Sequence, residues 1–306
     1  MEKFPLVSIC VITYNSSKYI LETLDSAKAQ TYQNIELIIS DDCSKDNTVE
    51  ICKNWINDNK ERFARTELIT VKKNTGISQN CNRVRDAARG EWIKGIAGDD
   101  ILFPNAIHSF VSFVEKKKSE DIVWVVSSIK IFKDHPDNLL YIWPNFNISE
   151  NIREQFRRQI MGNYIKAPGV FLKRETLNRL GGPNLDYPML EDDPLWIKFL
   201  TNGYKFYFID EVLVGYRVHS NAISTGNHAF KKQFFQSLYD FKKEITFPYM
   251  KKESMYLSYI IHKMEFYAAY RIVFAGKKRI RDKLQLKIAN YLKYLVKDYN
   301  KGYLER

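Results

Sequence analysis

The sequence predicts an α/β fold, in which a mostly parallel sheet carries helices on both faces and a helical extension follows at the C-terminus. Three observations support this prediction. Apolar, β-rich runs alternate with amphipathic stretches from residue 5 onward, several of the runs end in polar side chains, and the pattern becomes wholly helical after about residue 226. A chain of 306 residues is long enough to bury a substantial core.

Strands and helices alternate through the first 118 residues. Strands are expected at 5–15, 34–42, 66–74 and 91–100, and the helices that follow them at 18–30, 44–61, 76–90 and 104–118. Ser16 or Ser17 is placed to cap the first of these helices. This alternation indicates βαβ units and therefore neighbouring parallel strands.

The rest of the chain is less regular. Another strand is expected at 121–133, residues 150–225 mix helix and strand, and no stretch in 1–225 has the composition of a linker. We therefore expect one domain with two halves, residues 1–104 and 105–225, followed by a basic, aromatic-rich helical extension at 226–306.

The net charge of +11 lies entirely in that extension. Residues 1–225 hold 29 Lys and Arg and 29 Asp and Glu, whereas residues 226–306 hold 18 and 7. A basic, aromatic-rich segment suits an anionic membrane surface or a nucleic acid. The alternatives are a solvated helical face, a homodimer interface, or packing on the preceding domain.

The chain has the composition expected of a cytoplasmic protein. Its four cysteines have no metal-ligand spacing and are expected to be reduced: Cys10, Cys43, Cys52 and Cys81. We expect neither a secretory signal nor a transmembrane helix, because the N-terminus lacks the signal pattern and no apolar run is long enough. With the basic extension, this suggests a peripheral position at the inner face of the plasma membrane.

Three of the predicted strands end in polar clusters, at 13–15, 41–42 and 99–100. In open parallel sheets ligands bind beyond the carboxyl ends of the strands, so these clusters are expected to converge on one edge. The adjacent carboxylates of Asp99 and Asp100 repel each other unless a divalent cation lies between them and an anionic ligand, and Mg²⁺ or Mn²⁺ favours such oxygen donors. The alternatives are a strand end with solvated acids and a helix cap before Pro104.

Two later segments carry further candidates. In LEDDPLW, at 190–196, Asp192 or Asp193 either caps the following helix or is a general base whose pKa is raised by burial. In GYRVHSNAIS, at 215–224, His219 suits a metal ligand, a phosphate contact or a plain surface residue. The guanidinium group of Arg217 suits a phosphate or a carboxylate.

Seven segments together resemble family 2 glycosyltransferases, which are inverting enzymes with the GT-A fold. In chain order they are VSICVITYN, ELIISDDCSKDNT, NTGISQNCNRVRDAARGEW, AGDD, LGGPN, LEDDPLW and YRVH. The resemblance covers roughly residues 5–225. It implies that 1–104 is the half that binds a nucleotide sugar and that 105–225 is the half that binds the acceptor.

The resemblance also implies roles for the residues that would bind the nucleotide. Thr13 and Tyr14 match residues that line the base pocket, and the ring of Tyr14 would stack on the base. Asp42 matches an aspartate that hydrogen-bonds the base.

The remaining matches concern the metal and the reaction. Asp100 would hold the metal and Asp99 would contact the ribose or the metal, while His219 matches a histidine that joins the metal or the diphosphate. Asp192 matches the family's general base. The chain departs from the pattern at Ala97, where the family often has another aspartate, and at Pro194, which makes the choice between Asp192 and Asp193 less secure.

The implied activity is metal-dependent, inverting transfer of a sugar from a nucleotide sugar, expected to be UDP-linked, to a glycan hydroxyl in surface polysaccharide synthesis. The cofactor would be Mn²⁺ or Mg²⁺, and the acceptor a glycan or a lipid-linked glycan. The alternatives are a nucleotidyltransferase that makes sugar nucleotides and an inactive nucleotide-binding relative.

Other classes are disfavoured. A nucleotidyltransferase should have a glycine-rich loop after its first strand, and a dehydrogenase a Gly-x-Gly-x-x-Gly turn, but TYNSSKY stands there. We expect no nucleic-acid binding, because the acidic strand ends would repel a phosphate backbone.

Overall fold

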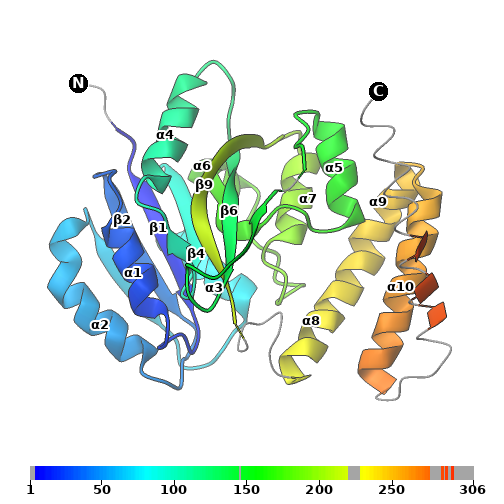
Figure 1. Ribbon diagram of the computed structural model, residues 1–306, viewed down its shortest axis with the longest axis horizontal. Helices are drawn as coiled ribbons and strands as arrows, with labels where there is room; N and C mark the ends of the chain where they lie inside the picture. Colours follow the sequence, from blue (N-terminus) through cyan, green and yellow to red (C-terminus); the bar gives the residue numbers. More distant parts are fainter. Residues whose placement is uncertain are drawn as a thin grey trace.

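The computed structural model describes residues 4–144, 146–219 and 228–275, with the short pieces 284–285, 287–288 and 291–292. A single sheet runs through the N-terminal two thirds of the chain, and helices gather beyond one end of it (Figure 1). The strand order is β3-β2-β1-β4-β8-β6-β9-β5, and β7 pairs with β6 at the side. The predicted α/β fold is confirmed.

The elements alternate as expected in the first half of the chain. The strands are β1 (Val7–Thr13), β2 (Ile35–Asp41), β3 (Thr66–Thr70), β4 (Trp92–Ala97), β5 (Ile101–Leu102), β6 (Trp124–Lys133), β7 (Leu139–Trp143), β8 (Val170–Lys173) and β9 (Tyr207–Val218). The helices up to the end of β9 are α1 (Ile20–Lys28), α2 (Thr48–Asn59), α3 (Ile77–Ala87), α4 (Ala106–Lys116), α5 (Ile152–Met161), α6 (Arg174–Arg179) and α7 (Asp193–Thr201). Short 3₁₀ turns lie at Lys60–Arg62 and Ala167–Gly169.

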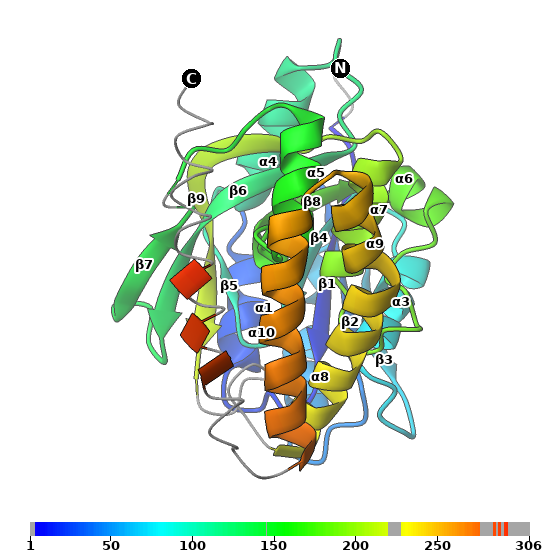
Figure 2. The same cartoon turned by 90° about the vertical axis from the view of Figure 1, so that its right-hand side faces the viewer.

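The first half of the sheet is parallel. β1 lies between β2 and β4 with Val11 opposite Ile39 and Ile96, and β3 pairs with β2 on the outside. β1 and β2 are buried almost throughout, as expected of strands covered on both faces. Helix α1 lies on one face and α3 on the other, which Figures 1 and 2 show from two sides. The carboxyl ends of β1, β2 and β4 therefore meet at one edge.

The second half of the sheet is mixed, which the expectation of a mostly parallel sheet did not specify. β8 runs antiparallel between β4 and β6, β9 runs parallel to β6, and β5 pairs antiparallel with β9. One sheet thus joins the two predicted halves, and the end of β9 comes beside the residues after β4.

The loop after β1 differs from the prediction in one detail. Neither Ser16 nor Ser17 caps α1 with its side chain; the N-cap is Tyr19, and the backbone carbonyl of Ser16 accepts the N–H groups of Tyr19 and Ile20. The backbone N–H of Ser16 is itself bonded to the hydroxyl of Thr48, which ties this loop to the start of α2.

The described part of the extension is helical, as predicted. It contains α8 (His228–Phe241), a π-helical turn at Lys242–Thr246, α9 (Phe247–Lys252) and α10 (Tyr256–Ala275). A second hydrophobic cluster joins it to the domain, with Ile160 and Ile197 on one side and Phe241, Met250 and Phe266 on the other. Packing on the domain, one of the predicted alternatives, therefore holds for these helices. Most of 276–306 lies outside the described residues.

Among the residues described, none of the helices combines the length and the apolar character needed to cross a bilayer.

Candidate active site

The carboxyl edge of β1, β2 and β4 is held together by backbone hydrogen bonds. The N–H of Asp42 donates to the carbonyl of Thr13 at 3.0 Å, and that of Gly98 donates to Ile12 at 2.9 Å. A Cβ on Gly98 would lie 2.9 Å from the Thr13 hydroxyl oxygen, so only glycine fits there without a shift. This hydroxyl is buried and has no hydrogen-bond partner among the described residues. Tyr14 follows it, half-buried, in the loop after β1.

Asp42 is buried and surrounded by donors. One carboxylate oxygen accepts the backbone N–H groups of Thr75 and Gly76 at 2.9 and 2.8 Å. The other accepts the Thr75 hydroxyl at 2.7 Å and Arg83 Nη2 at 2.5 Å. Gly76 has a φ of 88°, which a residue with a side chain adopts only under strain, so this turn favours glycine. Asp42 therefore fixes the turn that begins α3 and forms an ion pair with its arginine.

Asp99 and His219 meet across the sheet. His219 Nε2 lies 2.9 Å from a carboxylate oxygen of Asp99, which brings the residues after β4 and β9 together. The imidazole ring also lies 4.8 Å from the ring of Tyr19. Both side chains are largely covered, and that of Asp99 remains 27% exposed. A carboxylate and an imidazole thus face each other at the carboxyl edge, 120 residues apart in sequence.

Asp100 points into the protein. One of its oxygens accepts the backbone N–H of Arg217 at 2.8 Å, and the other is buried with no hydrogen-bond partner among the described residues. Burial, followed by the charge of Asp99, raises the pKa of Asp100 well above its usual range. The two adjacent aspartates therefore differ: Asp99 contacts His219, and Asp100 lies beneath the edge with an unused oxygen.

Arg217 is part of the support and does not present its guanidinium group to a phosphate in this structure. It is 1% exposed. It donates to the backbone carbonyls of Asp99 and Asp134 and, at 2.7 Å, to the carboxylate of Glu22. Of the two partners that the sequence suggested for Arg217, a phosphate or a carboxylate, the structure shows a carboxylate. Arg217 thereby fixes the position of the backbone that carries Asp99 and His219.

Three acids begin α7. The Asp192 side chain accepts the backbone N–H of Asp193 and so is the N-cap of the helix. Its second oxygen accepts Asn163 Nδ2 at 2.6 Å. Burial raises the pKa of Asp192, and burial together with the charge of Asp192 raises the pKa of Asp193 to about 7 and that of Glu191 to about 8. A carboxyl group that titrates in this range suits a proton acceptor.

Helix α3 connects these acids to the carboxyl edge. Its Asn80 donates to the Thr13 carbonyl at 3.3 Å, and its Arg83 binds Asp42. Its Ser78 donates to the carbonyls of Tyr187 and Pro188, just before the acidic run. Burial, followed by the charges of the nearby Glu191 and Asp192, raises the pKa of the Cys81 thiol on the same helix. Thus Thr13, Asp42 and Asp192 all lie around one helix.

The structure brings the sequence-predicted residues together in two groups around α3 and the end of β9. Sequence reasoning missed Arg83, Asn80 and Asn163. The spacing of Asn80 and Arg83 on one helical face was an available signal, but Asn163 has no signal in the sequence that connects it to Asp192.

The donor set fits a divalent cation in part. No group of three or more His, Cys, Asp and Glu side chains in metal-binding proximity occurs in the part of the chain that the structure describes. The Asp99–His219 pair nevertheless offers one oxygen and one nitrogen donor, and the second oxygen of Asp100 is unused. Mg²⁺ and Mn²⁺ sites commonly combine one or two protein ligands with the oxygens of a bound phosphate.

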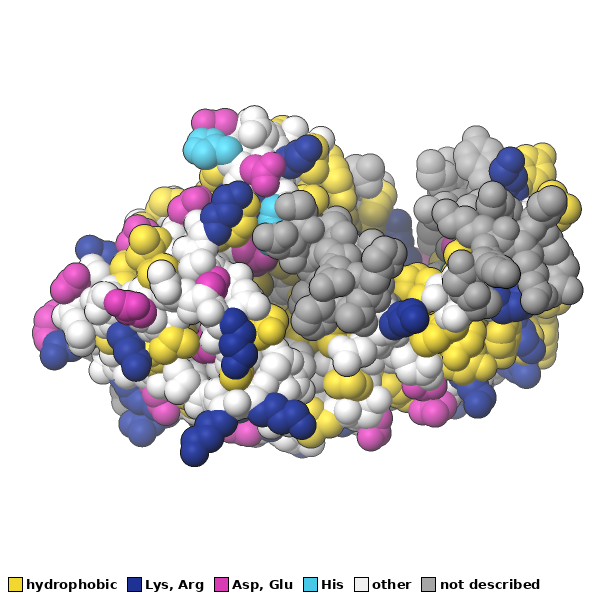
Figure 3. Space-filling model, turned by 90° about the horizontal axis from the view of Figure 1, so that it is seen from below, with side chains coloured by type: hydrophobic (Ala, Val, Ile, Leu, Met, Phe, Trp, Pro, Cys, Tyr) yellow, Lys and Arg dark blue, Asp and Glu magenta, His cyan; other side chains and the backbone are white. Residues whose placement is uncertain are grey.

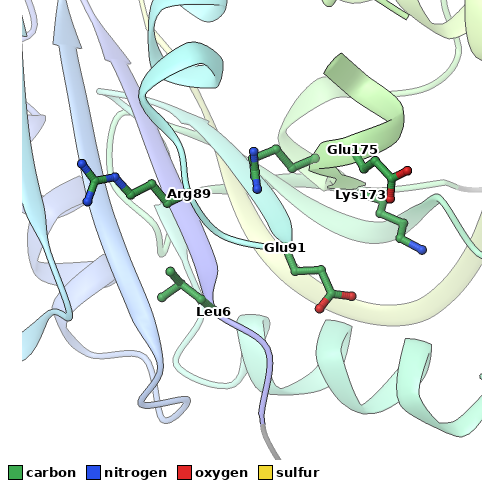
Figure 4. Close-up of a pocket in the computed structure, with 6 residues that line it drawn as sticks. Leu6, Arg89, Glu91, Lys173 and Glu175 are labelled. Carbon is green, nitrogen blue, oxygen red and sulfur yellow. The ribbon is translucent and has the colours of Figure 1, made fainter. Parts of the chain in front are cut away.

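A hollow of about 590 Å³ lies at the opposite edge of the sheet, where β1 and β4 begin. Figure 4 shows Leu6, Arg89 and Glu91 on one side of it and Lys173 and Glu175 on the other. None of these residues belongs to the site described above.

Comparisons with known proteins identify the family of the chain. The chain matches the glycosyl transferase family 2 model over residues 8–174. It is 30% identical to the UDP-Glc:alpha-D-GlcNAc-diphosphoundecaprenol beta-1,3-glucosyltransferase WfaP of Escherichia coli, over 76% of this chain and 84% of that protein. An uncharacterized glycosyltransferase of Rickettsia typhi is 28% identical, over 79% of this chain and 73% of that protein.

The fold is shared with TarS of S. aureus. A TarS structure of residues 1–349 in complex with UDP-GlcNAc aligns with a TM-score of 0.55 at 16% identity, over 93% of this chain and 79% of that one. A longer TarS chain aligns with a TM-score of 0.56 at 18% identity, and this chain covers 48% of it. With more than half of its length matched by the family model, the chain belongs to glycosyl transferase family 2.

Proposed function

We propose that this glycosyltransferase transfers a sugar from a UDP-linked donor to a glycan hydroxyl, with inversion and with the help of a divalent cation. The observation that supports this most strongly is the arrangement around α3. This helix contacts the strand ends on one side and, on the other, the segment just before the acids that begin α7. A nucleotide diphosphate at the strand ends would thus have a proton acceptor nearby.

The nucleotide would lie over the ends of β1 and β2. Thr13 offers a buried hydroxyl that has no hydrogen-bond partner in the described part of the chain, and Tyr14 offers a half-buried ring in the adjacent loop. Asp42 would meet the base together with Arg83 and Thr75, because these residues already hold its oxygens. The base pocket that we propose is therefore a preformed polar cluster.

The Asp99–His219 pair is the better-placed candidate to hold the cation. Its two donor atoms already lie 2.9 Å apart, whereas the unused oxygen of Asp100 is buried beneath them. The role of Asp100 as a ligand stays a prediction. When bound, the cation would neutralise the diphosphate and stabilise the negative charge that grows on the diphosphate as the diphosphate leaves the sugar.

Asp192 would take the proton from the acceptor hydroxyl as that oxygen attacks the anomeric carbon. Its raised pKa makes it a stronger base than an ordinary aspartate. Asn163 and the Asp193 N–H hold both of its oxygens, which fixes the direction of the carboxylate. A single displacement of this kind needs no nucleophile from the enzyme, and it inverts the configuration at the anomeric carbon of the transferred sugar.

The metal assignment is tested by comparing two variants. Asp99→Ala is expected to abolish most Mn²⁺-dependent binding of UDP, a loss of at least about tenfold in affinity, because it removes one donor of the Asp99–His219 pair. Asp100→Ala is expected to act mainly on folding stability. Calorimetric titration with UDP, with and without Mn²⁺, and thermal unfolding separate these effects. Normal Mn²⁺ dependence in Asp99→Ala would contradict the assignment.

We propose that the acceptor is a glycan carried on a lipid diphosphate, which is the kind of acceptor that the name of the WfaP relative gives for that protein. We also propose that the transfer takes place at the inner face of the plasma membrane. One surface supports this. At the junction of α9 and α10, Tyr256, Leu257 and Ile260 are 60%, 61% and 52% exposed, next to the exposed Lys251 and Lys252. Seen from below, the other end of the C-terminal helices also has Lys and Arg side chains among hydrophobic ones, at the right of Figure 3. Such a basic–apolar patch suits an anionic bilayer.

Point variants test the membrane proposal better than truncation, because α8–α10 bury a shared cluster with the domain. Leu257→Asp with Ile260→Asp is expected to reduce sedimentation with phosphatidylglycerol-containing vesicles by about tenfold, because it removes exposed apolar area that the bilayer would bury and adds negative charge. Leu139→Asp with Ile142→Asp, at exposed positions of β7, is the matched control. Unchanged sedimentation of the first variant would exclude this patch.

A panel of sugar nucleotides tests the activity itself. We expect UDP release from one or two UDP-sugars, dependent on Mn²⁺ or Mg²⁺ and stimulated by a lipid-linked glycan acceptor. Release of pyrophosphate from a sugar phosphate and UTP would instead show a nucleotidyltransferase. Binding of UDP without turnover of any sugar nucleotide would support an inactive relative.

A further inference from the structure

Two amide side chains connect the acids of α7. Asn163 follows α5 and donates from Nδ2 to Asp192 at 2.6 Å. Gln159, one turn earlier on α5, donates from Nε2 to Asn163 Oδ1 at 3.0 Å and to Asp193 Oδ1 at 2.6 Å. Gln159 is 1% exposed, whereas Asn163 lies at the surface. The chain of contacts therefore runs from a buried carboxyl, through two amides, to the proposed base.

The acceptors in this chain fix which way each amide points. Gln159 must place its NH₂ group toward Asn163 Oδ1 and Asp193 Oδ1, because its own oxygen would be repelled by both. The Gln159 oxygen is left buried without a hydrogen-bond partner among the described residues. Since Asn163 Oδ1 accepts from Gln159, its NH₂ group must face Asp192. An amide held in this way can only donate to the base.

A fixed donor has a chemical consequence for Asp192. Burial and the negative charges of Glu191 and Asp193 favour its protonated form, and the Cys81 thiol of α3 lies within reach of its charge. The Asn163 amide, the backbone N–H of Asp193 and the Lys166 ammonium group favour its ionised form. The Asn163 bond is first among these opposing contributions, so it limits how far burial raises the pKa of Asp192.

From this geometry we infer that Asn163 is a positioning residue, which holds Asp192 ionised and directed toward the acceptor, and that Gln159 sets the direction of Asn163. This inference rests on the proposed role of Asp192 as the base. Asn163 touches no reacting atom itself. It acts by keeping an ionised oxygen in place until the acceptor proton arrives.

The segment that carries Asn163 is anchored at its other end. The buried Lys94 of β4 donates from Nζ to the carbonyls of Pro168 and Val170, and to its own neighbour Gly95. Residues 163–170 are therefore tied to the sheet on one side and to α7 on the other. A positioning role needs such rigidity.

The experiment compares three variants of the full chain in the transfer assay across pH. Asn163→Ala and Gln159→Leu are expected to lower kcat by about tenfold or more, with the donor KM within about twofold, and to move the acid limb upward by about one pH unit. Gln155→Leu is the matched control. Gln155 is also on α5 and 1% exposed, but it bonds the backbone of Ser149 and Phe206. It should lower stability and leave the acid limb unchanged.

The Asp192→Asn variant separates the proposed role of Asp192 as the base from the inferred positioning role of Asn163. If this variant loses transfer but Asn163→Ala keeps the wild-type acid limb, the positioning role is wrong and the base assignment stands. If Asp192→Asn keeps near-normal transfer, the base assignment itself is wrong. An equal shift of the acid limb in Gln155→Leu would overturn the inference, because a general loss of packing would then explain the result.

Discussion

Asp42 and the acids of α7 are carboxylates on opposite sides of the same helix, and their surroundings differ. Asp42 accepts four hydrogen bonds, one of them from Arg83. Asp192, the proposed base, accepts two, from Asn163 and from the backbone N–H of Asp193, and burial raises its pKa. A carboxylate with many donors and a cation is suited to hold a fixed charge, whereas one with few donors is suited to exchange a proton near neutral pH. This difference fits the proposed roles, in which Asp42 binds the nucleotide and Asp192 takes the proton of the acceptor.

The largest effect is expected from Asp192→Asn, which tests the role of Asp192 as the base. Removing the proposed base is expected to lower kcat by roughly a thousandfold, while UDP affinity stays within about twofold. Transfer kinetics and calorimetric titration measure the two effects. Asp193→Asn is the control, with a much smaller loss. If Asp193→Asn is the more damaging change, the base lies one residue later than proposed.

The binding side is tested by Arg83→Leu. Asp42 would then lose its cation while staying buried, which is expected to destabilise the fold by about 3 kcal/mol and to weaken UDP binding by at least about tenfold. Arg89→Leu is a matched control, because the Arg89 side chain is exposed near the end of the same helix. Denaturant unfolding and UDP titration are the measurements. Equal behaviour of the two variants would contradict the structural importance of the ion pair.

The third test uses the pH dependence of stability. The pKa of Asp193 is raised in the folded state, so the folded protein binds its proton more tightly than the unfolded chain. This contribution is complete below the unfolded pKa of about 4 and is lost as the pH rises through about 7. Asp193→Asn is therefore expected to reduce the fall in unfolding free energy between pH 5 and pH 8, by on the order of 2 kcal/mol. Parallel curves for both proteins, from urea unfolding, would contradict this.

Much of the fold follows from local patterns, because strands and helices of the first half alternate with clear periodicity. The strand order of the second half does not follow, because nothing in the sequence around β8 says that it inserts antiparallel between β4 and β6. The described part of the C-terminal extension was expected to be helical. Its packing on α5 and α7 depends on a cluster formed by residues far apart in the chain.

The candidate site likewise follows in part from the sequence and in part only from the tertiary structure. The convergence of Thr13, Asp42 and Asp99 follows from their positions at the ends of neighbouring parallel strands. Which of two adjacent aspartates contacts His219 depends on the turn after β4, where Asp99 stays at the edge and Asp100 turns inward. Arg217 was a candidate phosphate contact, but only tertiary structure shows that Glu22 and two carbonyls already occupy its guanidinium group.

Helix α3 has a kinetic consequence. The proposed nucleotide pocket and the segment before Asp192 both contact this one helix, through Asn80 and Arg83 on one side and Ser78 on the other. A nucleotide sugar bound at the strand ends would therefore contact the same helix that supports the proposed proton acceptor. Substrates are expected to bind in a compulsory sequence, donor before acceptor, and initial-rate patterns with a dead-end UDP analogue would reveal that order.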